Sequence, residues 1–173
     1  MDKTPKKLTE EGREKLKLEI QKMQDDLKKL REIKANAYTA TGDTWHDNPY
    51  FNELERDEQQ LVVKIALAEK TMHEAEIVDT SKHDANTVEI GSIFKCHCCY
   101  NNDKDDIEEE VFEIVGHGES SIEEGKLDYE SPVAKNLLGH KLNDVIVFEI
   151  PAGEVAYTIV KFYKNWKEVE AEG

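Results

Sequence analysis

The chain reads LKLEIQKMQDDLKKL over residues 16–30, and this stretch decides the fold of the N-terminal half. Its apolar residues recur at alternating steps of four and three, at Leu16, Ile20, Met23, Leu27 and Leu30. Such spacing keeps one apolar stripe along one side of a helix and is typical of a coiled coil. The pattern continues less regularly through Ile33 and Ala37, and Thr9 is a typical helix cap. The spacing predicts a helix from about Thr9 to about Thr39, about 45 Å long.

A second seam of similar length follows Pro49, a residue favoured in the first turn of a helix. Its members are Leu54, Leu61, Ile65, Ala68, Met72 and Ala75. Glu58 is its one polar interruption. Either stripe alone would face water and leave its helix marginally stable. Because the connection between the two is short, the sequence predicts an antiparallel coiled-coil hairpin over residues 1–79, with an acidic tip at residues 41–50.

After residue 79 the hydrophobic period changes from helical to alternating. The polar run DTSKHDAN at residues 79–86 breaks the helical pattern, and we place an interdomain linker at residues 80–86. The alternating segments predicted as strands are residues 87–100, 110–116, 145–150 and 155–162. Ser131 and Pro132 begin a predicted short helix that Gly139 ends. The fold class is therefore α+β, with an antiparallel sheet in a domain at residues 87–173.

Composition and charge exclude several classes of function. Charged residues make up 35% of the 173 residues, and the formal net charge is -15. So negative a chain repels phosphate, which argues against general binding to nucleic-acid backbones. Apolar runs do not approach the roughly 20 residues that span a bilayer, and the start lacks the apolar core of a signal peptide. We expect a cytoplasmic protein that does not contact membranes.

The cysteines are clustered in one place, Cys96-His97-Cys98-Cys99. Three cysteines so close together fit reduced thiols rather than a disulfide framework. A zinc site would need a second set of ligands elsewhere in the sequence, and His117 is a candidate for such an outside ligand. On a strand, Cys96 and Cys98 would face one side, with His97 and Cys99 facing the other. The pattern favours buried or edge thiols over zinc.

The two halves together resemble the bacterial Gre transcript-cleavage factors, GreA and GreB. The N-terminal match is a helical hairpin whose tip carries Gly42-Asp43 and then Asp47-Asn48. The C-terminal match comprises residues 88–92, residues 124–139 and residues 151–160. The order and spacing of these pieces make the resemblance specific, and it covers nearly the whole chain. It implies an FKBP-like fold for the C-terminal domain, without isomerase activity.

The resemblance also implies a function and a set of site residues. A Gre factor binds bacterial RNA polymerase through its C-terminal domain and reaches with its hairpin down the secondary channel. The acidic tip there helps to hold catalytic Mg²⁺ and to orient the water that cleaves backtracked RNA. Such a factor is not itself an enzyme, has no cofactor of its own, and is expected to act as a monomer. The residues that carry these roles are Asp43 and Asp47 as catalytic and Mg²⁺-binding carboxylates, Trp45, His46 and Asn48 as further tip contacts, and Glu130, Ser131 and Pro132 as the polymerase-binding turn.

The tip departs from the family pattern, which leaves an alternative open. The family has two residues between the acids, whereas three separate Asp43 from Asp47, and the second acid is Asp rather than Glu. An added residue in a tight loop can re-aim a side chain, and a site displaced by about 1 Å can lose most of its effect. A Gre-like channel regulator that does not stimulate cleavage is therefore the second hypothesis. A coiled-coil interaction module unrelated to transcription is the third.

A purely structural role of the tip residues is also open. Asp and Gly are ordinary turn residues, so the two acids could form a solvated turn. Trp45 either packs back on the hairpin beside Tyr50 or Phe51, or stacks on a polymerase element or a base. His46 is either a plain surface residue or a phosphate contact.

Overall fold

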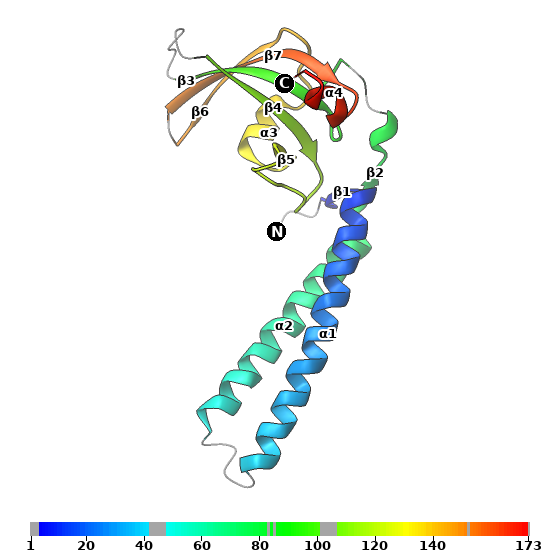
Figure 1. The fold of residues 1–173 in the computed structure, drawn as a ribbon, viewed down its shortest axis with the longest axis vertical. Coiled ribbons are helices and arrows are strands. Elements are labelled where there is room, and N and C mark those ends of the chain that lie inside the picture. Colours follow the sequence, from blue (N-terminus) through cyan, green and yellow to red (C-terminus); the bar gives the residue numbers. More distant parts are fainter. Residues whose placement is uncertain are drawn as a thin grey trace. The chain divides into compact units, whose positions relative to one another are not determined.

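A computed structural model describes residues 4–41, 48–82, 84, 86–100, 107–151 and 153–172. The chain forms two compact units (Figure 1). One comprises Arg13–Ala75 with Met1–Pro5, and the other comprises Lys6–Gly12 with Glu76–Gly173. The linker predicted at residues 80–86 therefore falls inside the second unit, as do residues 6–12, which were predicted to belong to the hairpin.

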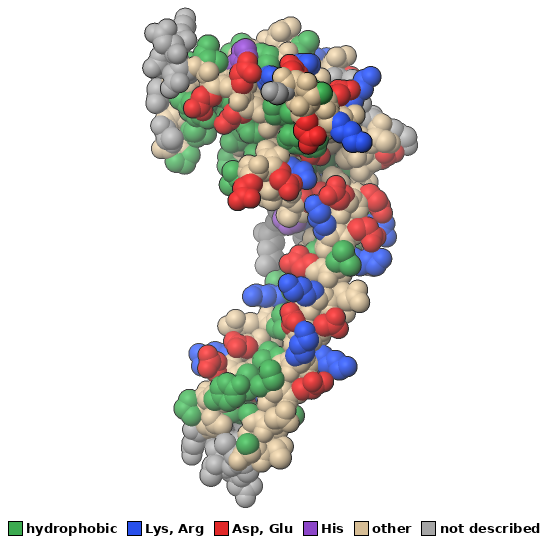
Figure 2. All heavy atoms as spheres, in the orientation of Figure 1, with side chains coloured by type: hydrophobic (Ala, Val, Ile, Leu, Met, Phe, Trp, Pro, Cys, Tyr) green, Lys and Arg blue, Asp and Glu red, His purple; other side chains and the backbone are tan. Residues whose placement is uncertain are grey.

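The first unit is the antiparallel hairpin that the two seams predict. Helix α1 spans Glu10–Thr41 and helix α2 spans Pro49–Glu74. The two run side by side (Figure 1). The most buried side chains between them are Ile20, Phe51, Leu54 and Ile65. On the face of the hairpin that Figure 2 shows, side chains of Lys and Arg lie among those of Asp and Glu, as expected where both helices have a solvent face.

One seam position differs from the expectation. The side chain of Ile33 is 45% exposed, and Lys34 instead takes the place between the helices, where its side chain is 21% exposed. Heptad steps from Leu30 lead to residue 34 rather than residue 33, so the less regular continuation was assigned to the wrong neighbour.

Two very short strands begin the second unit. Strand β1 spans Lys7–Thr9 and pairs in parallel with β2, Glu76–Val78. Leu8, in the middle of β1, is 1% exposed. This pairing places a segment from the start of the chain in the second unit, and a short 3-10 turn, Thr80–Lys82, follows β2.

A curled five-stranded sheet forms the rest of the second unit (Figure 1). Its strands are β3 Ile93–Tyr100, β4 Ile107–Val115, β5 Lys126–Asp128, β6 Val145–Ile150 and β7 Gly153–Tyr163, in the spatial order β5-β4-β3-β7-β6. Neighbouring strands are antiparallel except β4 and β5, which are parallel. Helix α3, Pro132–Leu137, is the predicted short helix, and a further helix, α4, spans Trp166–Glu170.

The core of this unit lies between α3 and one face of the sheet. Its fully buried side chains include Phe94, Ile114, Leu137, Val155 and Ile159. Burial alternates along β3, as a strand with one covered face requires. The sheet and α3 together give the predicted α+β architecture.

Residues 87–92 do not form the predicted first part of a strand. Thr87 makes an isolated bridge to Lys141, and the chain then turns at Gly91, whose φ is +95°. Such a backbone angle suits glycine and interrupts strand pairing. In addition, a Cβ at Gly91 would lie 2.6 Å from Cβ of Thr80, so the turn also requires a residue without a side chain.

In the described part of the chain, each helix is too short or too polar to cross a bilayer.

Candidate functional site

At the end of the hairpin, the structure describes the start of α2 from its cap residue Asn48 onward. The side-chain oxygen of Asn48 accepts a hydrogen bond from the backbone N–H of Tyr50 at 3.0 Å, which caps α2. Pro49 occupies the first turn, as predicted. The other four predicted tip residues, Asp43, Trp45, His46 and Asp47, lie outside the described residues. Asn48 is thus held as a helix cap.

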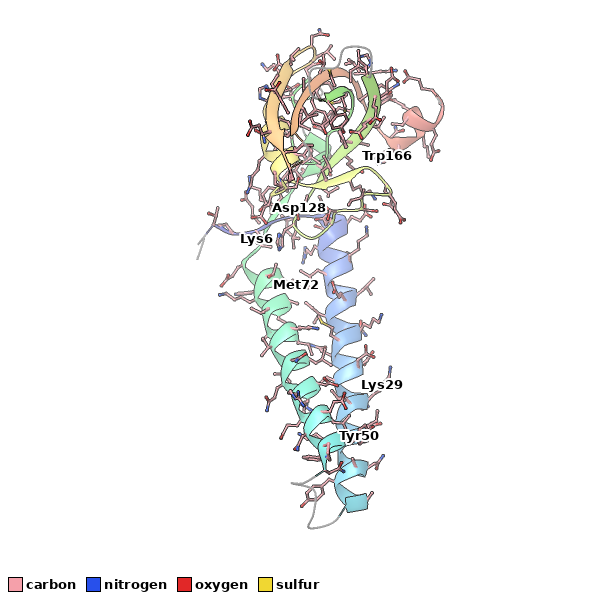
Figure 3. The ribbon with its side chains drawn as sticks, turned by 90° about the vertical axis from the view of Figure 1, so that its left-hand side faces the viewer. Lys6, Lys29, Tyr50, Met72, Asp128 and Trp166 are labelled. Carbon is pink, nitrogen blue, oxygen red and sulfur yellow. The ribbon has the colours of Figure 1, made fainter. Side chains whose placement is uncertain are left out.

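An aromatic pair lies one turn below the end of the hairpin. Tyr38 of α1 and Phe51 of α2 have ring centroids 6.2 Å apart. Phe51 is 5% exposed, whereas Tyr50, labelled in Figure 3, is 53% exposed. The heptad spacing of Phe51 to Leu54 and Glu58 would have indicated its place in the seam. The buried ring of Phe51 fixes the two helices to each other near the acidic tip.

A charged layer follows the aromatic pair. Arg31 Nε donates to Glu58 Oε1 at 2.7 Å, and Lys34 Nζ donates to Glu58 Oε2 at 3.0 Å. The hydrogen bond from Arg31, and then that from Lys34, hold the pKa of Glu58 below its ordinary value. The Lys34 ammonium also lies 5.3 Å from the centroid of the Phe51 ring. The charge of Glu58, the polar interruption of the α2 seam, is therefore neutralised by Arg31 and Lys34 of α1.

The predicted docking turn is built as a helix start. Ser131 Oγ accepts a hydrogen bond from the backbone N–H of Ala134 at 3.2 Å and caps α3. The backbone N–H of Ser131 donates to the carbonyl oxygen of Asp128 at 2.9 Å. Pro132 occupies the first turn of α3 and its side chain is exposed. A rigid turn thus presents Pro132 on the surface.

Glu130, the third docking residue, is tied into the second unit. Lys6 Nζ donates to its two carboxylate oxygens at 2.6 and 2.8 Å, and His117 Nδ1 lies 2.7 Å from Oε2. The hydrogen bond from Lys6 is the largest cause that lowers the pKa of Glu130, and the His117 contact adds to it. Lys6 lies 124 residues before Glu130 and His117 lies 13 residues before it, so local patterns gave no signal for these contacts.

A shallow cavity of about 420 Å³ opens elsewhere on the second unit. It is lined mainly by the 123–126 segment and by Trp166, whose indole N–H donates to Glu113 Oε2 at 2.6 Å. A second cavity, of about 370 Å³, lies beside the docking turn and includes Tyr129 and Leu138. The latter places apolar side chains next to Glu130 and Ser131.

The cysteines divide as the strand pattern predicts. Cys96 and Cys98 are fully buried in the core, whereas His97 and Cys99 are only partly covered. Burial raises the pKa of the Cys96 thiol to about 12. Cys98 donates to Glu110 Oε2 at 3.2 Å, and burial raises its pKa as well. These two thiols serve as packing groups in the core.

Comparison with known proteins gives a consistent family. The family model described as "Transcription elongation factor, GreA/GreB, C-term" matches residues 82–164. The transcription elongation factor GreA of Halalkalibacterium halodurans is 33% identical over 155 residues, which covers 89% of this chain and 94% of the relative. GreA of Clostridioides difficile is 32% identical over 154 residues, which covers 89% and 93%.

The solved structure of the transcription factor Gfh1 is similar over 92% of this chain and 98% of that one, with 20% identity and a TM-score of 0.44. The sequence relatives, in contrast, match both the hairpin and the sheet unit at 30% identity or more over most of their length. This chain belongs to the GreA/GreB family of transcription elongation factors.

Proposed function

We propose that this protein is a transcription elongation factor that binds bacterial RNA polymerase in the cytoplasm and stimulates cleavage of backtracked nascent RNA. The observation that carries the proposal is the 33% identity to a GreA over 89% of the chain, which includes the hairpin as well as the docking turn. The protein acts as an accessory factor, and the cleavage reaction remains that of the polymerase.

The hairpin is suited to deliver its connection to a distant site. Helix α1 has 32 residues, about 48 Å at 1.5 Å per residue. The Phe51 ring and the Glu58 charged layer hold the helices together close to the tip. A rod held in this way can bring short acidic side chains to a fixed depth in a narrow channel.

In the proposed mechanism Asp43 and Asp47 contribute carboxylates to an Mg²⁺ site shared with the polymerase. Mg²⁺ prefers carboxylate and water ligands, and when bound it stabilises the attacking and leaving oxygens of a phosphoryl transfer. Trp45, His46 and Asn48 contact the channel or the RNA beside these acids. Of the two carboxylates, Asp43 keeps the family's Gly-Asp context.

Docking is assigned to the turn that precedes α3. Glu130 is held by Lys6 and His117, and Ser131 caps the helix. These contacts support a preorganised surface, in which little conformational freedom is lost when a partner binds. The exposed ring of Pro132 is the apolar contact of this surface.

A reconstituted elongation complex, stalled and backtracked, tests the proposal. The full chain is expected to shorten the labelled transcript in an Mg²⁺-dependent way, and Asp43→Asn is expected to abolish shortening while polymerase binding persists. Asp57→Asn, which changes an exposed acid of α2 away from the tip, is the matched control and should cleave normally. Cleavage by Asp43→Asn at the normal rate would rule out the metal role of Asp43.

The tip spacing favours one second candidate, a channel regulator without cleavage activity. Three residues rather than two separate Asp43 from Asp47. The same assay distinguishes the candidates, because a regulator would bind the polymerase and slow synthesis without shortening the transcript. A chain that does not bind the polymerase would contradict both.

A further inference from the structure

Three metal-ligating side chains meet on the second unit, outside the proposed elongation chemistry. They are His117, Asp128 and Glu130. His117 Nδ1 lies 2.7 Å from Glu130 Oε2 and 3.9 Å from Asp128 Oδ2, and one ligand atom from each residue lies within 4.8 Å of the others. Figure 3 labels Asp128 and Lys6 in this region.

The spacing of these atoms suits a small divalent ion. Zinc binds nitrogen and oxygen ligands at about 2.0–2.2 Å in a tetrahedral arrangement, so two of its ligands lie about 3.3–3.5 Å apart. The two distances measured from His117 Nδ1, 2.7 and 3.9 Å, lie on either side of that value. Changes of less than about 1 Å would bring each of these two distances to it.

Backbone groups fix the ligands in place. The N–H of Gly118 donates to Asp128 Oδ2 at 2.8 Å, and the N–H of Glu130 donates to Asp128 Oδ1 at 2.8 Å. The N–H of His117 donates to the carbonyl oxygen of Lys7 at 2.8 Å. Outer contacts of this kind orient metal ligands and raise metal affinity.

Lys6 already supplies a positive charge at this cluster. Its ammonium lies 2.6 and 2.8 Å from the two carboxylate oxygens of Glu130. The Lys6 side chain is 39% exposed, so it can swing on its flexible stem into solvent when another cation takes its place. The cluster thus holds one positive charge, the Lys6 ammonium, which a more tightly bound cation can replace.

We propose that His117, Asp128 and Glu130 form a binding site for a first-row divalent metal ion, Zn²⁺ in particular, in which the metal replaces the Lys6 ammonium at Glu130. The imidazole favours zinc, cobalt and nickel over magnesium and calcium, which prefer oxygen ligands alone. The site is separate from the Mg²⁺ assigned to the hairpin tip. Its occupation links metal supply to the docking turn, because Glu130 belongs to both.

Titration of the full chain with Zn²⁺ by calorimetry, and with Co²⁺ by visible absorption, tests the site near neutral pH. One equivalent is expected to bind, and His117→Gln should weaken it by at least about tenfold, since it removes a ligand. His97→Gln and His140→Gln are matched controls, because each of these histidines contacts a single carboxylate in the described structure. His46→Gln controls for the tip. All three should bind as the unchanged chain does.

Lys6→Met gives a second test that does not depend on the His117 variant. Removal of the competing ammonium is expected to tighten Zn²⁺ binding severalfold, and circular dichroism verifies that each variant folds. Unchanged or weaker binding by Lys6→Met would overturn the proposal. So would absence of binding by the full chain, or a sulfur-to-cobalt absorption band, which would assign the ion to cysteines.

Discussion

Lys34 of α1 and Glu58 of α2 form an ion pair of 3.0 Å at the two positions where charged residues replace apolar ones between the helices. Their side chains are 21% and 19% exposed. A polar pair in a coiled-coil seam costs stability but specifies how the helices align, because a shift of one helix leaves both charges unpaired. The pair therefore sets the register of the hairpin next to its tip.

Glu58→Ala is expected to destabilise the hairpin by about 1–2 kcal/mol. The partly buried Lys34 loses its 3.0 Å ion pair and keeps the longer contact with Glu55, at 3.4 Å. The double variant Lys34→Leu, Glu58→Leu should recover that loss or exceed the original stability, since apolar residues then fill both positions. Urea denaturation followed by circular dichroism measures both. A double variant less stable than Glu58→Ala would show that the pair contributes net stability.

The pH dependence of the hairpin follows from the lowered pKa of Glu58. A carboxyl whose folded pKa is depressed adds stability that is present above the ordinary value of 4.5 and is lost as pH falls through the folded pKa. The difference in unfolding free energy between the unchanged chain and Glu58→Gln should be largest near neutral pH and shrink toward about pH 3. A difference that stays constant over this range would contradict the assignment.

Glycine is required where Glu119 holds the start of α1. The Glu119 carboxylate accepts from the backbone N–H of Thr9 at 2.9 Å and from Thr9 Oγ1 at 2.5 Å. A Cβ at Gly116 would meet the Glu119 side chain and would also lie 2.9 Å from Cα of Leu8. The three atoms nearest to a Cβ at Gly12 all belong to the Glu119 side chain.

Gly116→Ala is therefore expected to cost about 1–3 kcal/mol, because a backbone has to shift. Gly12→Ala should cost less, since the flexible side chain can move at the loss of its hydrogen bonds. Thermal unfolding compares the two variants. Equal losses would mean that the backbone of β1 yields as easily as the Glu119 side chain.

The thiols of the core are expected to resist alkylation. The pKa of Cys96 is raised to about 12 by burial, so almost none of it is thiolate near neutral pH, and Cys98 is buried in the same core. Mass spectrometry after iodoacetamide treatment should find Cys96 and Cys98 unmodified until the chain is unfolded in urea. Rapid labelling of Cys96 in the folded chain would contradict its position in the core.

Pro132→Ala is expected to weaken polymerase binding several-fold without loss of folding, because Pro132 is exposed at the docking turn. Pro151→Ala, which changes an exposed proline at the β6–β7 turn, is the matched control. Equilibrium binding to the polymerase measures both. An equal effect of the two variants would assign docking to another surface.

The features predicted correctly are those that neighbouring residues encode. The heptads give both helices, and Ser131 and Pro132 give α3, since caps and periodicity act within a few residues. Strands β1 and β2 were not predicted, because each has three residues and is too short for a periodic signal. The contact of Lys6 with Glu130 was not predicted either, because the two residues are 124 positions apart in the chain. The roles of Asp43 and Asp47 remain predictions from the resemblance.

The parallel pair of β1 and β2 has a consequence for how the chain can be divided. Residues 6–12 belong with the sheet, so the hairpin is topologically an insertion into the other unit rather than a domain placed before it. A fragment that begins at Glu76 would lack β1, the partner strand of β2. It would also lack Lys6 and Thr9, and therefore their contacts with Glu130 and Glu119. Exchange of hairpins between relatives therefore requires two junctions, one after Gly12 and one before Glu76.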